Sequence, residues 1–400
     1  MISKIKRYLG IDGQTLYLIA YCIYLLSEVL STTMFPISGK IYTFCKYFAV
    51  VLIGCKILKS DKYTWYQAVV TSVLVGLTVV VRLVAGYSDP FLWIILLIGA
   101  KDVPFDKIIK IYFVLTVSVV MGAFMASNLS VIENLQYRME GRGIRNSFGI
   151  VYPTDFASHV FYLMIVFFFL KREKLKSSHY IMGIAIASFV YYFCNTRLDT
   201  ICMLLAIVLY FFVGYLHKRE CSLTAQYRKR IRWTWVMQYA MLICATIMVG
   251  LSVLYNPDNR LLAKLDGLLN SRLMLGHKGI IKYGFPLFGR LVEMIGNGST
   301  TTLPSDSIYF FIDCSYLYTT LQYGLIFGIV IILIFIVCCR KYKYDDYFLV
   351  AIALVSVNCM VAHHLMELAY NPFPLAFFAS VFPLNGTDSG IIRKRINNDY

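Results

Sequence analysis

The sequence predicts an all-α polytopic membrane protein with about 12 transmembrane helices. Of its 400 residues, 59% are hydrophobic and only 15% are charged, whereas charged residues make up about 25% of an average soluble domain. Apolar runs of about 20 residues, each long enough to cross about 30 Å of hydrocarbon, recur along the chain. These observations exclude a soluble enzyme, a disordered chain and a disulfide-bonded secreted scaffold. We expect residues 1–400 to form a single integral membrane domain.

Polar clusters between the apolar runs define the limits of the expected spans. These spans are residues 15–36, 41–57, 66–88, 90–100, 108–127, 153–170, 179–195, 198–216, 233–254, 316–338, 347–369 and 372–390. The fourth is short and the twelfth contains Asp388, so either could be re-entrant or tilted. The first run is too long for a cleaved signal peptide, and no small-residue cleavage site follows it.

Lysine and arginine residues in the short loops predict the orientation, because they accumulate on the cytoplasmic side. They precede the first span, follow the even-numbered spans and end the chain, within residues 4–7, 56–62, 101–110, 171–176, 218–232, 340–343 and 393–395. We therefore expect both termini to be cytoplasmic. The Lys-, Ile- and Tyr-rich composition is typical of an AT-rich bacterial genome, which indicates a multi-pass protein of the bacterial plasma membrane.

Two segments on the expected outer side also carry basic residues. Residues 128–152 form a short arginine- and glycine-containing segment, and residues 255–315 form a long loop. Long loops are translocated largely regardless of charge, so the orientation stands. Orientation alone thus leaves part of the net charge of +16 unexplained. We expect these two loops to form the active site and to bind an anionic substrate.

The first outer segment contains Arg138, Arg142 and Arg145 among three glycines. Spacings of four and three would place the arginines on one face of a helix, but the glycines favour a loop with amides that can approach a phosphate. Arginine provides bidentate, permanently charged donors that suit a diphosphate. We therefore assign Arg142 and Arg145 to diphosphate binding. The alternative is a solvated basic loop that touches anionic lipid headgroups.

Two further positions extend the expected diphosphate site. Arg197 lies at the outer end of the seventh span, where a charged residue is often functional; a structural pair with Asp199 or a snorkelling side chain is the alternative. In the long loop, residues 261–282 read as one amphipathic helix over the outer face, with Arg272 binding phosphate and Lys278 binding sugar or phosphate. The alternative is a cationic helix that rests on lipid headgroups.

Three side chains compete to orient or deprotonate an acceptor hydroxyl: His159, Asp313 and Glu367. His159 could equally be a satisfied core histidine, Asp313 could pair with an outer arginine, and Glu367 could make only a structural hydrogen bond. Glu367 follows two adjacent histidines, but such a short constellation has low specificity for a metal. The 11 cysteines form no CxxC pair, and Walker A, GxGxxG, HExxH and GxSxG motifs are absent. We therefore expect no metal and no cofactor.

Four segments resemble the Wzy-type polysaccharide polymerases, a family related to O-antigen polymerases and ligases. They are RGIRNSFGIVYPTDFASH (142–159), NTRLDT (195–200), LLNSRLML (268–275) and DCSYLYTTLQYG (313–324). The resemblance lies in their order, their expected sidedness and the single long outer loop before the last three spans. Glu367 followed by Asn371 is similar to the closing element of the family.

The resemblance implies a membrane glycosyltransferase with a GT-C-like fold. Such an enzyme would join oligosaccharide repeats linked to undecaprenyl diphosphate into a capsular or O-antigen-like polysaccharide at the outer face of the membrane. Its partners would be the lipid-linked oligosaccharide, the lipid bilayer, a flippase and a chain-length regulator, without nucleic acid. The fixed arginines would stabilise the departing diphosphate without a metal, and Tyr316 would contact sugar.

Two other functions remain open at this point. A lipid-linked oligosaccharide flippase or other secondary transporter would suit twelve spans, but the chain shows no two-fold internal repeat. An O-antigen ligase-type glycosyltransferase would share the chemistry and differ in its acceptor.

Overall fold

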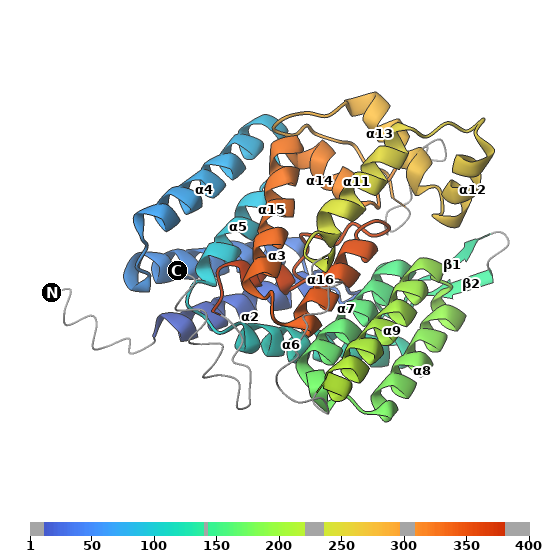
Figure 1. Cartoon of the computed structure of the whole chain (residues 1–400), viewed down its shortest axis with the longest axis horizontal. Helices are drawn as coiled ribbons and strands as arrows, with labels where there is room; N and C mark the ends of the chain where they lie inside the picture. Colours follow the sequence, from blue (N-terminus) through green and yellow to red (C-terminus); the bar gives the residue numbers. More distant parts are fainter. Residues whose placement is uncertain (1–11, 140–142, 221–235, 297–308, 381–400) are drawn as a thin grey trace.

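The computed structural model describes residues 12–139, 143–220, 236–296 and 309–380, and helices dominate this part of the chain (Figure 1). Six of the described helices are long and apolar enough to cross a membrane. They are α2 (Gly13–Ser31), α3 (Gly39–Ser60), α4 (Trp65–Ala85), α6 (Phe105–Asn128), α7 (Pro153–Lys171) and α9 (Arg197–Glu220). The predicted class, an all-α membrane protein, is confirmed at this level.

The other described helices of the apolar regions are not among these six. They are α5 (Asp89–Gly99), α8 (Ser177–Cys194), α11 (Ala240–Val253), α14 (Ser315–Tyr323), α15 (Leu325–Lys341) and α16 (Asp346–Asn358). The described residues therefore do not reproduce twelve uninterrupted spans. The run 347–369 is helical only to Asn358, and residues 372–380 of the last expected span contain the 3-10 helix η2 (Phe373–Phe377).

Gly324 explains why the expected span 316–338 is two helices. Its φ is 100°, in the region that only glycine adopts readily. A Cβ at this position would lie 2.4 Å from the carbonyl oxygen of Leu287 and 2.5 Å from the backbone nitrogen of Gly289. The tight approach of the long loop thus requires a glycine and interrupts the helix between α14 and α15.

Local sequence signals explain where several helices begin. The Asp12 side chain caps α2, Thr64 and Gln67 form a capping box at α4, and Pro153 occupies the first turn of α7. Each of these features satisfies or avoids a free amide at a helix N-terminus. The Asp345 side chain accepts a hydrogen bond from the backbone nitrogen of Phe348 and caps α16.

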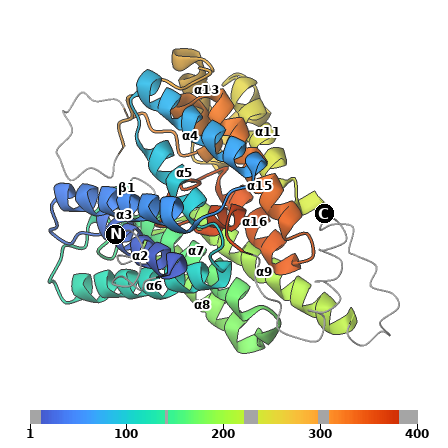
Figure 2. The same ribbon diagram turned by 90° about the vertical axis from the view of Figure 1, so that its left-hand side faces the viewer.

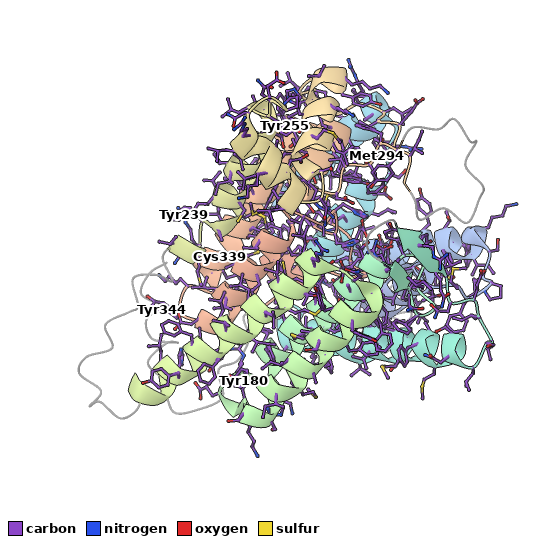
Figure 3. The ribbon with its side chains drawn as sticks, turned by 90° about the vertical axis from the view of Figure 1, so that its right-hand side faces the viewer. Tyr180, Tyr239, Tyr255, Met294, Cys339 and Tyr344 are labelled. Atoms are coloured by element: carbon purple, nitrogen blue, oxygen red, sulfur yellow. The ribbon has the colours of Figure 1, made fainter. Side chains whose placement is uncertain are left out.

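The helices pack in two connected groups. α2 packs against α3 and α6, and these three helices lie side by side in Figure 2. α7 and α8 pack against α9, and α16 joins this group to α11. Figure 3 shows Tyr255 toward one end of the molecule and Tyr180 and Tyr344 toward the opposite end.

The two segments expected on the outer side differ in detail from the sequence-based expectation. Residues expected to form a glycine-containing loop instead form an antiparallel hairpin of β1 (Gln136–Met139) and β2 (Gly143–Asn146). The helix expected over residues 261–282 is wrong as a single element. It is two helices, α12 (Arg260–Leu268) and α13 (Arg272–Tyr283).

The break between α12 and α13 has a local cause. Asn270 and Ser271 have φ angles of 53° and 63°, which end the first helix. The buried Asp266 side chain then accepts hydrogen bonds from the backbone nitrogens of Leu273 and Met274, at 2.8 and 3.1 Å. This carboxylate caps the N-terminus of α13 and fixes the angle between the two helices.

Some basic residues that suggested cytoplasmic loops have structural partners. Lys56 is buried, and its ammonium group lies 2.7 Å from the carboxylate of Asp61 and donates to the backbone carbonyls of Gly99 and Lys101. Arg172 forms an ion pair of 2.7 Å with Asp345. These cations therefore hold helices together, in addition to any effect on orientation.

Candidate functional site

A polar cavity of about 210 Å³ lies between α2, α3, α5, α14 and the segment that follows α16. Its walls combine charged and aromatic side chains. The lining residues are Tyr24, Glu28, Lys46, Asp89, Trp93, Tyr318, Thr319, Tyr323, His363, Met366 and Glu367. Polar side chains facing a cavity within apolar helices indicate a binding site more strongly than the same residues on a surface.

The charges of this polar cavity are mostly negative. Glu28 of α2 and Lys46 of α3 form an ion pair of 2.6 Å, with both side chains largely buried. Asp89, in the first turn of α5, and Glu367 add two further carboxylates. Lys46 is the one Lys or Arg side chain in this lining, so the wall favours a ligand with hydroxyl donors or a cation.

Glu367 is in contact with two imidazoles in the segment after α16. Its two carboxylate oxygens lie 3.3 Å from Nε2 of His363 and 3.0 Å from Nδ1 of His364. Burial raises the pKa of Glu367, although the nearby His363 opposes this shift. Burial also lowers the pKa of His363, and it lowers the pKa of His364 to about 3. Near neutral pH, His364 is therefore a neutral imidazole.

His159 lies beside this cluster but is closed off. Its side chain is fully buried, and its Nε2 lies 2.9 Å from the hydroxyl of Thr32. The ring of Tyr370 stacks between His159 and His364, with centroid distances of 4.1 and 3.7 Å. Because His159 lines neither the polar cavity nor the apolar groove described below, its position favours the alternative, a core histidine. It is only half satisfied, since its buried Nδ1 has no hydrogen-bond partner among the described residues.

Arg272 and Asp313 come together, as one of the two alternatives for Asp313 anticipated. The guanidinium lies 3.3 Å from the carboxylate, and its Nε donates to the carbonyl of Val361 at 2.7 Å. The charge of Arg272 also interacts with Asp199 and His363. Arg272 therefore joins the beginning of α13 to the segment that carries Glu367.

The remaining arginines occupy different environments. Arg145 is buried; its Nε donates to the carbonyl of Cys194 at 2.9 Å, and the guanidinium lies over the ring of Tyr152. Arg197 is exposed at the beginning of α9. Arg142 lies outside the described residues. Two of the four expected diphosphate ligands, Arg145 and Arg272, are thus largely buried and bonded to backbone carbonyls.

The two tentative sugar contacts lie away from the polar cavity. Tyr316 is buried and donates to the carbonyl of Ser356 at 2.7 Å, and Lys278 is exposed on α13. Tyr318, two residues later on α14, lines the polar cavity instead. The sequence could not distinguish Tyr316 from Tyr318, because the packing of the other helices decides which face of α14 meets the polar cavity.

An apolar groove of about 390 Å³ lies on the other side of α14, against α11 and α15. Its residues are Leu242, Ala245, Thr246, Val249, Gly250, Phe285, Tyr316, Thr319, Thr320, Leu325, Gly328, Ile329, Ile331, Ile332 and Leu365. Thr319 lines both this apolar groove and the polar cavity. The two spaces therefore adjoin at this residue of α14, which forms part of the wall of each.

Sequence reasoning missed Glu28, Lys46 and Asp89, which line the polar cavity. Glu28 and Lys46 lie within the first two expected spans, and a charged residue inside a span is a functional candidate by default. That signal could have identified both residues. The pairing of two helices then places them in one cavity, which their separation in the sequence does not predict.

Comparisons of this chain with protein-family models, with characterised proteins and with solved structures find no match.

Proposed function

We propose that this protein is a membrane glycosyltransferase that polymerises oligosaccharide repeats linked to undecaprenyl diphosphate into a surface polysaccharide. The observation that carries the proposal is that the apolar groove and the polar cavity are adjacent and share Thr319 in their walls. A lipid-linked sugar is apolar at one end and polar at the other, and this pair of spaces matches both ends.

The polar cavity suits a sugar. Its volume of about 210 Å³ is enclosed by carboxylates, a lysine, a tryptophan and tyrosines. Carboxylates accept hydrogen bonds from sugar hydroxyls, and aromatic faces cover the apolar faces of sugar rings. In this proposal Glu367 is the carboxylate that accepts the proton of the attacking hydroxyl, because it lines the cavity while Asp313 is paired with Arg272.

The basic residues provide the second element of the proposed reaction. Departure of the lipid diphosphate develops negative charge, which fixed guanidinium groups stabilise. Arg272 is next to the Glu367 segment. Arg145 lies in β2 and donates to the carbonyl of Cys194 at the end of α8, and Arg197 begins α9. We place the site at the outer face of the plasma membrane, with both termini in the cytoplasm, which follows from the lysine and arginine distribution.

A reconstitution experiment tests the function. The full chain, purified into liposomes, receives a fluorescent oligosaccharide linked to undecaprenyl diphosphate. We expect a ladder of longer lipid-linked chains and release of undecaprenyl diphosphate. Transport of the labelled lipid across the bilayer without elongation would contradict the proposal and support a flippase.

Cells provide an independent test of the product. Deleting the gene should leave single capped repeats in place of long polymer on the cell surface. Unchanged polymer length would overturn the polymerase function. A normal polymer that is no longer attached to its final acceptor would instead indicate a ligase.

A further inference from the structure

The geometry points to a divalent metal site formed by His363, His364 and Glu367. The three ligand atoms lie within 4.8 Å of one another. The carboxylate oxygens of Glu367 lie 3.3 Å from Nε2 of His363 and 3.0 Å from Nδ1 of His364. Ligands about 2.1 Å from one cation are separated by about 3.0–3.5 Å. The two contacts of Glu367 already have this spacing, and metal binding requires side-chain adjustments within the 4.8 Å span of the group.

The two imidazoles are held in position by their neighbours. Tyr370 stacks on His364 at a centroid distance of 3.7 Å. The rings of Phe311 and Tyr318 have centroids 5.1 and 5.7 Å from that of the His363 ring. These aromatic contacts restrict ring rotation, which reduces the conformational entropy lost on metal binding.

Asp155 provides the kind of support found around metal-bound histidines. Its carboxylate lies 3.9 Å from Nε2 of His364, the nitrogen opposite the proposed ligand atom. Metal-ligating histidines usually direct their other ring nitrogen toward a carboxylate or carbonyl, which fixes the tautomer. Asp155, His364 and the metal would therefore form the carboxylate–histidine–metal arrangement that is common at such sites.

The open side of the proposed metal site faces the polar cavity. His363 and Glu367 both line this cavity of about 210 Å³. Two histidines and one glutamate with an open fourth position form the ligand set of catalytic zinc sites, and imidazole with carboxylate also suits Co²⁺, Mn²⁺ and Fe²⁺. Glu28 and Asp89 make the cavity wall more negative, which further favours a divalent cation.

The metal site deepens the proposed function, and its catalytic role rests on that function. A metal at this position would bind and polarise a sugar hydroxyl or a diphosphate oxygen in the cavity. Glu367 would then be a metal ligand, the metal would polarise the acceptor hydroxyl, and a second carboxylate of the cavity, Asp89, would accept its proton. Binding of the metal itself does not require the proposed function.

Cobalt binding tests the site directly. The full chain is purified in detergent without a polyhistidine tag, stripped with a chelator and titrated with Co²⁺ alone, and the visible absorption of bound Co²⁺ is recorded. We expect one equivalent to bind and Zn²⁺ to displace it. His363→Ala, His364→Ala and Glu367→Gln should each lose the spectrum, and Asp155→Asn should weaken binding by about 10- to 100-fold.

His277→Ala is the matched control, because His277 lies on α13 and contacts the carbonyl of Ser252 instead. It should bind Co²⁺ like the parent chain. Size-exclusion profiles show that each variant compared is folded, and the titration of the parent chain tests the proposal even if a variant fails to fold. The site is overturned if the parent binds no stoichiometric Co²⁺, or if the three folded ligand variants bind it normally.

The polymerisation assay separates this inference from the proposed function. Stoichiometric Co²⁺ binding by a chain that elongates no oligosaccharide would retain the metal site and overturn the function. Elongation by a stripped chain that binds no Co²⁺ would retain the function and overturn the metal site.

Discussion

The guanidinium of Arg272 lies 3.3 Å from the carboxylate of Asp313, across a junction of three segments. Arg272 begins α13, Asp313 precedes α14, and the Nε of Arg272 also donates to the carbonyl of Val361 after α16. A single side chain thus connects the long loop to the segment that carries His363, His364 and Glu367. The positive charge of Arg272 therefore lies near the proposed position of the leaving diphosphate.

Arg272→Ala should lower the polymerisation rate by about 10²- to 10³-fold, because it removes a fixed cation from an electrostatic site. Arg272→Lys should recover part of the rate, since it restores the charge without the bidentate geometry. Rates are measured in liposomes with the fluorescent lipid-linked oligosaccharide. Arg290→Ala, at an exposed position of the same loop, is the control and should retain activity. Equal losses for Arg272→Ala and Arg272→Lys with normal folding would argue against a charge effect.

Filling the apolar groove should reduce activity without unfolding the protein. Gly250 lines this groove, and a Cβ there would meet no atom within 4 Å. Gly250→Leu should displace about two methylene groups of a bound lipid, at about 0.8 kcal/mol each, and weaken substrate binding by about tenfold. The dependence of the rate on substrate concentration measures this effect.

Gly76→Leu is the control for the groove variant. Gly76 also lies within a long apolar helix, α4, and a Cβ there would meet no atom within 4 Å. It does not line the apolar groove. If both leucine variants lose the same activity, the loss reflects a general effect on the membrane helices and the lipid position is wrong.

The ion pair between Arg172 and Asp345 should be important for stability. Its atoms are 2.7 Å apart, and the two side chains are only 14% and 6% exposed. Arg172→Ala leaves a buried carboxylate without this cation and should lower the free energy of unfolding by about 3–5 kcal/mol. Thermal unfolding in detergent measures the change. Lys174→Ala, at an exposed neighbouring position, should leave the transition in place; a similar drop in both variants would argue against the ion pair.

Cysteine labelling tests the expected orientation. Ile281→Cys places a thiol on the long loop at an exposed position, and Lys174→Cys places one at the opposite side by the lysine and arginine distribution. A membrane-impermeant thiol reagent should label the first variant in intact cells and the second only after permeabilisation. The parent chain, with its native cysteines, provides the background. The reverse pattern would invert the topology and move the site to the cytoplasmic face.

The sequence by itself determined the class of this protein. Apolar runs of span length with few charges specify membrane helices, because an unsatisfied backbone amide is costly in hydrocarbon and a helix satisfies it internally. Local signals also predicted several helix limits: Pro153 begins α7, and the predicted run 108–127 lies within α6. The candidate residue Arg272 was identified because its charge lies where orientation does not require it.

Only the tertiary structure decided which charged residues meet. Glu28 and Lys46 become a pair when α2 packs on α3, and Glu367 faces them from more than 300 residues later in the chain. The interruption at Gly324 depends on the close approach of the long loop. Local helix propensity does not predict such a tertiary contact. Whether a histidine is closed off, as His159 is, or faces a cavity, as His363 does, is decided by the side chains that surround it. Those neighbours come from distant segments, so neither residue spacing nor composition specifies them.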